Sequence, residues 1–185
     1  GDNETDSANF TSIDNLYLLS GVEVFGSDSY DTASDTTHPY PQADIMGQTA
    51  VFHKNLDTRV SILKIHPGIT PSVVRNILCG EDTRAVIIET YGAGNAPSKE
   101  WFLNIVREAS SSGKILLNIT QCSAGTVNMD IYATGKTLKE AGVINGYDST
   151  TESALGKLFF LLGESQDNEF VKSRLDENLM GEISK

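Results

Sequence analysis

Apolar residues along the chain occur in short runs that alternate with segments of helical periodicity. The runs 60–65, 85–89 and 115–119 are rich in Val, Ile and Leu and have the length of buried strands. Each is followed by a loop and, later, by another such run, a pattern typical of strand–helix–strand crossovers. We therefore predict an α/β fold: a small three-layer domain with a mostly parallel sheet of about four strands and right-handed connections.

The segments between these runs contain helix start and stop signals. Thr70 followed by Pro71 is an N-cap with proline at the first helical position, and predicts a helix to Leu78. A second helix is expected from an N-cap at Ser98 to Gly113. Its apolar face consists of Trp101, Phe102, Ile105 and Val106.

Two further helices are predicted near the C-terminal end. Ser149 or Thr150 caps the first of them, and its apolar residues share one side. These residues are Ala154, Leu155, Leu158, Phe159 and Leu162. The last helix is amphipathic and covers about 167–179.

Residues 1–58 have a different composition, rich in Asp, Ser and Thr. We predict an irregular acidic arm here, with candidate strands at 16–25 and 49–53, followed by the domain at 59–185. The chain begins at Gly1 without an initiator methionine, and we expect coding sequence upstream of it.

Charge and cysteine content narrow the function classes. The net charge of -11 and the pI of about 4.6 argue against nucleic acid and anionic membranes as partners. No apolar run approaches the roughly 20 residues that span a bilayer. Cys79 and Cys122 have no metal-site spacing, so we expect two free thiols in a reducing, cytoplasmic environment.

The string TYGAGNAP, residues 90–97, directly follows the run 85–89 and is the first candidate binding loop. Loops at the carboxyl ends of parallel strands are where ligands bind in open α/β sheets. The third glycine of a dinucleotide fingerprint is replaced by Pro97, and the next strand ends at Thr120 without a carboxylate. A dinucleotide site is therefore not expected. No GxSxG string accompanies the three histidines, so a Ser/His/Asp triad is not expected either.

Four strings in one order carry a family resemblance. They are KIHPGITPSVVRNIL (64–78), TYGAGNAP (90–97), NITQCSAGTVNMDIYATGKTL (118–138) and AGVINGYDSTTESALGKLFFLLG (141–163). Over about 59–185 the chain resembles the C-terminal domain of cytosolic (type I) L-asparaginases. The resemblance implies a two-domain α/β amidohydrolase that converts L-asparagine to L-aspartate and ammonia without metal or cofactor. It also implies a homodimer or dimer of dimers and a role in amino-acid metabolism.

In that family the nucleophilic threonine lies in a TGGT loop of the N-terminal domain. This chain contains neither TGGT nor HGTDT, and Thr134-Gly135 and Asp82-Thr83 stand in other surroundings. The resemblance therefore implies that the chain supplies a pocket wall and dimer contacts and is inactive alone. The alternative is a non-catalytic amino-acid-binding or regulatory module with the same fold.

The resemblance also assigns candidate site residues. Tyr132 matches the tyrosine of a YATG string that helps to close the active site, and its alternative is a half-buried packing residue. The residues Gly92, Gly94, Asn95 and Ala96 match a loop that approaches a partner subunit's substrate pocket, and their alternative is a structural turn.

Some bacterial members bind L-asparagine at an additional, allosteric site, and its residues match Glu89, Thr120, Gln121 and Cys122. The family uses an arginine at the position of Glu89. A carboxylate there inverts the sign of the contact with an effector carboxylate. We expect allosteric binding to be lost or altered, unless Arg84 or another cation substitutes.

Overall fold

A computed structural model describes residues 55–122, 125–179 and 181–184, which belong to one compact unit that begins at Asn55. Of the expected acidic arm, 1–58, only residues 55–58 are described. The candidate strands at 16–25 and 49–53 therefore lie outside the described residues, and the boundary at 58/59 stays a prediction.

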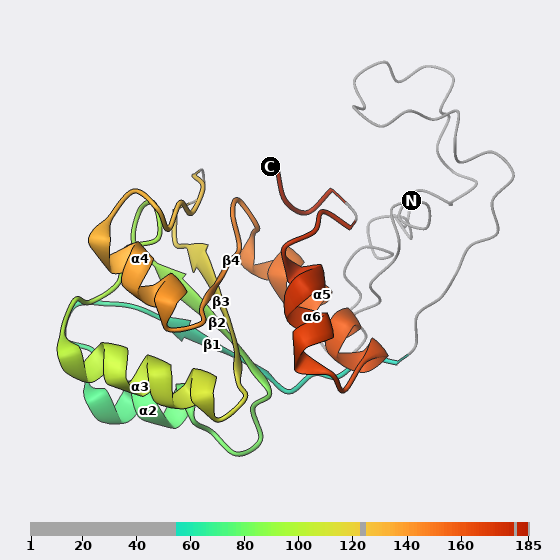
Figure 1. The fold of residues 1–185 in the computed structure, drawn as a ribbon, viewed down its shortest axis with the longest axis horizontal. Coiled ribbons are helices and arrows are strands. Elements are labelled where there is room, and N and C mark those ends of the chain that lie inside the picture. The colour runs from blue at the N-terminus through green and yellow to red at the C-terminus, as the bar shows by residue number, and fades with distance from the viewer. Residues whose placement is uncertain (1–54, 123–124, 180, 185) are drawn as a thin grey trace, which may run out of the picture. The chain divides into compact units, whose positions relative to one another are not determined.

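A four-stranded parallel sheet forms the centre of this unit (Figure 1). Its strands lie side by side in chain order: β1 (Val60–Lys64), β2 (Ala85–Thr90), β3 (Ile115–Thr120) and β4 (Ile144–Asn145). The register places Ile88 opposite Leu63 on one side and Asn118 on the other. The predicted parallel sheet of about four strands is confirmed, and all pairings between its strands are parallel.

Helices cover both faces of the sheet. The first face carries α2 (Pro71–Leu78), α3 (Glu100–Ser111) and α4 (Ala133–Glu140), and the second carries α5 (Thr151–Glu164) and α6 (Asn168–Leu175). Three successive crossovers over one face require the same hand of connection. Because helices cover both faces of the sheet, the predicted three-layer α/β architecture is confirmed. None of these helices is long and apolar enough to cross a membrane.

The predicted N-caps of α2 and α5 are confirmed, whereas the N-cap of α3 and the length of α6 differ from the prediction. The Thr70 hydroxyl accepts a hydrogen bond from the Val73 N–H, and Thr150, rather than Ser149, caps α5. Ser98 is not the N-cap of α3, because that helix begins one residue later, after Lys99, without a side-chain cap. The last helix is shorter than predicted and ends at Leu175.

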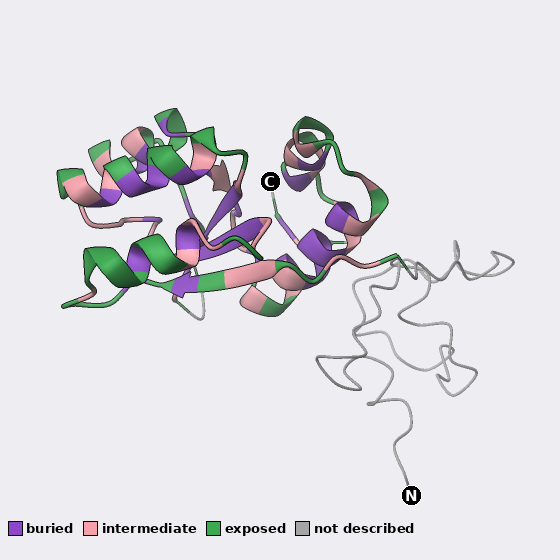
Figure 2. Cartoon of the chain, turned by 90° about the horizontal axis from the view of Figure 1, so that it is seen from below, coloured by how far each residue is buried: buried purple, intermediate pink, exposed green. Residues whose placement is uncertain are grey.

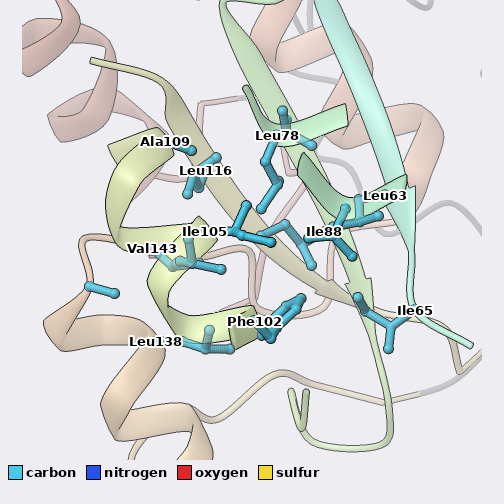
Figure 3. Close-up of a cluster of buried hydrophobic side chains, with 14 of the residues drawn as sticks. Leu63, Ile65, Leu78, Ile88, Phe102, Ile105, Ala109, Leu116, Leu138 and Val143 are labelled. Carbon is cyan, nitrogen blue, oxygen red and sulfur yellow. The ribbon is translucent and has the colours of Figure 1, made fainter. Parts of the chain in front are cut away.

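The core lies in two layers, one on each face of the sheet (Figure 2). All residues of β2 and β3 are buried because both faces of these central strands are covered. Phe102 and Ile105 of α3 pack with Ile88 and Leu63 of the sheet (Figure 3). Burying each side chain of this size stabilises the fold by about 1.5–3 kcal/mol before entropic costs.

Candidate functional site

Three loops meet where the parallel strands end, since the carboxyl ends of β2, β3 and β4 lie at the same edge of the sheet. We call residues 91–97, after β2, the glycine loop. The segment after β3 leads to α4, and the turn after β4 leads to α5. This is the edge at which open α/β sheets bind ligands.

The glycine loop is closed by its own backbone. The Tyr91 N–H donates to the Asn95 carbonyl at 2.8 Å, and the Asn95 and Gly94 N–H groups donate back to the Tyr91 carbonyl. Gly94 has a φ of 103°, and a Cβ there would lie 2.7 Å from the Cγ1 of Val127. Glycine is therefore required at position 94 by both conformation and space.

Buried polar side chains of strand β3 form hydrogen bonds to the backbone of the glycine loop. The Thr120 hydroxyl donates to the Gly92 carbonyl at 2.7 Å, and the Asn118 amide donates to the Gly94 carbonyl at 3.3 Å. The Thr90 hydroxyl in turn donates to the Asn118 side-chain oxygen at 2.6 Å. Thr90 and Asn118 are fully buried, so these bonds are shielded from water. The sequence signal for Asn118 was a lone polar residue within an apolar run, and its role was missed.

Helix α4 brings Tyr132 to the same edge. Tyr132 is the N-cap residue of α4, makes no side-chain cap bond and is half exposed. Two residues later, the Thr134 hydroxyl donates to the side-chain oxygen of Asn95 at 2.8 Å. A Cβ on Gly135 would lie 2.6 Å from the Met129 backbone oxygen, so the glycine permits this close packing. The first turn of α4, which follows Tyr132, is thereby joined to the glycine loop. The roles of the site residues stay predictions, namely those of Tyr132, Gly92, Gly94, Asn95 and Ala96.

Large apolar side chains are exposed beside this junction. Tyr91 begins the glycine loop, and Ile131 and Tyr132 precede α4; their exposed fractions are 38%, 57% and 50%. Exposed apolar side chains gathered around one loop are typical of surfaces that another protein covers.

A polar cavity of about 470 Å³ lies beside the glycine loop. All four residues predicted for an additional binding site line it, namely Glu89, Thr120, Gln121 and Cys122, together with Lys64 and the turn 148–152. The Gln121 amide nitrogen is used internally, because it donates to the backbone oxygens of Ile65 and Glu89 at 2.6 and 2.8 Å. The structure therefore brings the predicted residues together.

The charge of Glu89 is neutralised inside this cavity. Its side chain is 10% exposed, and its two oxygens accept hydrogen bonds from Lys64 at 2.9 Å and from Thr151 at 2.6 Å. Burial alone would raise the pKa of Glu89, but the two hydrogen bonds and the Lys64 charge outweigh it and lower the pKa. The carboxylate is therefore ionised at neutral pH and paired.

Arg84 does not provide the substitute cation. It precedes β2, at the opposite edge of the sheet, and its guanidinium donates to the backbone oxygens of Leu162 and Ser165, both at 2.8 Å. It also donates to the side chains of Asn168 and Asp57. Arg84 thus fixes the end of α5, and Lys64 is the cation that faces Glu89.

A second cavity, of about 720 Å³, lies near the edge strand β4 and is lined by residues of 126–130, α4, β4 and α6. None of the predicted site residues lines it. Across the described residues there is no group of three or more His, Cys, Asp or Glu side chains that could hold a metal ion. Cys79 and Cys122 are both free thiols.

Comparison with known proteins identifies the family of this chain. Residues 59–174 match the model of the glutaminase/asparaginase C-terminal domain. "L-asparaginase 1" of Escherichia coli K12 is 41% identical over 148 residues, which cover 80% of this chain and 43% of that protein. "60 kDa lysophospholipase" of the mouse is 40% identical over 135 residues, which cover 72% of this chain and 24% of that protein.

A solved structure agrees. L-asparaginase I of Vibrio cholerae superposes with a TM-score of 0.69 at 40% identity, over 75% of this chain and 42% of that chain. The chain therefore spans less than half the length of these relatives. The match is more than half of this chain, and the parallel sheet, glycine loop and α4 lie within it. The chain belongs to the glutaminase/asparaginase C-terminal domain family.

Proposed function

We propose that this chain is the C-terminal domain of an L-asparaginase that hydrolyses L-asparagine to L-aspartate and ammonia. The observation that carries the proposal is the junction of the glycine loop with the start of α4, held by the 2.8 Å bond between Thr134 and Asn95. Family membership and the identity to the E. coli enzyme support it. The nucleophilic threonine would lie in an N-terminal domain, because no TGGT loop occurs in this chain.

In the assembled enzyme, the threonine would attack the side-chain amide of the substrate and release ammonia from a tetrahedral intermediate. Water would then hydrolyse the acyl-enzyme, with the oxyanion held by hydrogen-bond donors of the N-terminal domain. This domain would supply the opposite wall. The Tyr132 phenol, which is exposed, and the Asn95 amide, which is part-exposed, belong to that wall, and both can donate to oxygen.

We further propose that the wall is completed by association with an N-terminal domain and with a second copy of the chain. The support is the exposed group formed by Tyr91, Ile131 and Tyr132 around the glycine loop. A homodimer is the simplest closed arrangement that covers such a surface. The acidic net charge and the two free thiols fit a cytoplasmic protein with no nucleic acid or membrane partner.

For the polar cavity we propose that L-asparagine does not act as an effector. A ligand carboxylate entering it would meet the Glu89 carboxylate. Lys64, the only cation among the described residues that line the cavity, is already paired with Glu89. The alternative reading, a regulatory amino-acid-binding module, draws its support from this same cavity. It requires a ligand that tolerates a fixed carboxylate at position 89.

The test joins this chain to a nucleophile-bearing N-terminal domain and measures ammonia release from L-asparagine. We expect turnover by the joined protein. Tyr132→Phe keeps the ring and removes the hydroxyl, and should lower kcat/KM by at least about tenfold. The control is Thr137→Val, which removes a hydroxyl that bonds only to the Ala133 carbonyl of its own helix and should change kcat/KM by less than twofold. No turnover by a folded, joined protein would favour the regulatory module.

A further inference from the structure

The hydroxyl of Thr134, the second residue of α4, makes a hydrogen bond outside its own helix. Thr137, on the same helix, donates to the carbonyl of Ala133, four residues earlier, at 2.9 Å. This is the common local bond of a helical threonine. Thr134 instead donates to the side chain of Asn95, which is 39 residues earlier in the sequence. The bond therefore joins two different elements rather than one turn of α4.

This bond determines which end of the Asn95 amide faces outward. A hydroxyl that donates to the side-chain oxygen fixes that oxygen toward Thr134, and the amide NH₂ group takes the other side. Among the described residues, the amide nitrogen of Asn95 has no hydrogen-bond partner. Its two N–H donors are thus available to an oxygen acceptor.

The backbone of Asn95 is already fixed. Its N–H and carbonyl groups both pair with Tyr91, and the sheet holds Gly92 and Gly94 on either side of Ala93. The remaining freedom of Asn95 is rotation of its side chain. That rotation is what the Thr134 hydroxyl restrains.

We propose that Thr134 is a positioning residue: it orients the Asn95 amide so that its N–H donors face an oxygen acceptor of the substrate. This inference rests on the proposed function for its catalytic consequence, and on the described contacts alone for the orientation of Asn95. Tyr132 is the N-cap residue of the helix that carries Thr134, so the bond from Thr134 to Asn95 also links the Tyr132 backbone to the glycine loop.

The test uses Thr134→Val, which has nearly the same shape without the donor, and Thr134→Ser, which retains the hydroxyl. In the protein joined to its N-terminal domain, we expect Thr134→Val to raise KM for L-asparagine about tenfold. We expect its kcat to change by less than threefold. Thr134→Ser should stay within about twofold of the parent in both constants. An equal KM in Thr134→Val and the parent would overturn the proposal.

Solution NMR of the 185-residue chain supplies a readout that does not depend on activity. The side-chain amide resonances of Asn95 should shift and broaden in Thr134→Val, and stay in place in Thr134→Ser. Unchanged Asn95 amide resonances in Thr134→Val would show that the hydroxyl does not orient the amide. If the joined parent protein lacks turnover, the proposed function fails, and the NMR comparison alone decides the positioning role.

Discussion

The ammonium group of Lys64 lies 2.9 Å from the carboxylate of Glu89, at the point where β1 and β2 end in the polar cavity. The strand register places these two residues opposite each other, so the pair is built into the sheet. The cavity therefore contains its own cation–anion pair where the family resemblance implies an arginine.

The first prediction concerns ligand binding in this cavity. Titration of the chain with L-asparagine, followed by NMR, should leave the amide resonances of Gln121 and Cys122 unchanged. Glu89→Gln retains a partner for Thr151 and frees Lys64, so the variant should gain binding of carboxylates. Saturable shifts of Gln121 and Cys122 in the parent protein, equal to those in Glu89→Gln, would contradict this account.

The second prediction concerns the glycine loop. Gly94→Ala should destabilise the domain by about 2 kcal/mol or more, because it adds a Cβ against Val127 at a φ of 103°. Gly92→Ala is the control: its φ is also positive, but no atom lies within 4 Å of the added Cβ. We expect a loss of about 1 kcal/mol there. Urea denaturation measures both, and equal losses would show that the contact with Val127 does not matter.

The third prediction concerns a buried ion pair outside the site. Lys157 of α5 lies 2.7 Å from Glu182, and the two side chains are 5% and 10% exposed. Its ammonium group also donates to the Leu175 carbonyl at 2.9 Å. Lys157→Met should lower the free energy of unfolding by about 3 kcal/mol, because it leaves Glu182 buried without this cation.

The control for this pair is Lys139→Met, which removes an exposed ion pair with Asp130. Its effect should stay below about 0.5–1 kcal/mol. Urea denaturation curves of the two variants measure the difference. Similar losses in the free energy of unfolding of the two variants would mean that the buried ion pair of Lys157 stabilises the fold no more than the exposed pair of Lys139.

The fourth prediction concerns the pH dependence of stability. Because the pKa of Glu89 in the folded state lies below its ordinary value of 4.5, the unfolded state binds the proton first. The contribution of Glu89 to the free energy of unfolding is therefore fully present at pH values above 4.5. It is lost as the pH falls through the lower pKa of the folded state. Glu89→Gln should flatten the loss of stability across this acidic range. Glu108→Gln, at an exposed ion pair, should change the profile less.

The sheet and most helices could be predicted because buried strands and amphipathic helices leave periodic apolar patterns. Helix α4 and strand β4 were not located, since α4 buries only Gly135 and Leu138 and β4 has two residues. Ser98 was wrongly expected to cap α3 because capping depends on backbone geometry as well as residue type.

The site could be predicted only in part. Family resemblance pointed to the glycine loop and to four residues that line the polar cavity, but not to Lys64, to the turn 148–152 or to the contacts among these residues. The bonds from Thr134 to Asn95 and from Lys64 to Glu89 join residues 39 and 25 positions apart. Such contacts depend on strand register and helix packing, which a single sequence does not reveal.

The central claim is that this chain is an L-asparaginase domain without the nucleophile. Ammonia release from L-asparagine by the purified chain at high protein concentration tests it most directly, with folding verified by circular dichroism. We predict no turnover by the chain alone and turnover once a TGGT-containing N-terminal domain is added. Turnover by the chain alone would contradict the account, because a nucleophile would then lie within these 185 residues.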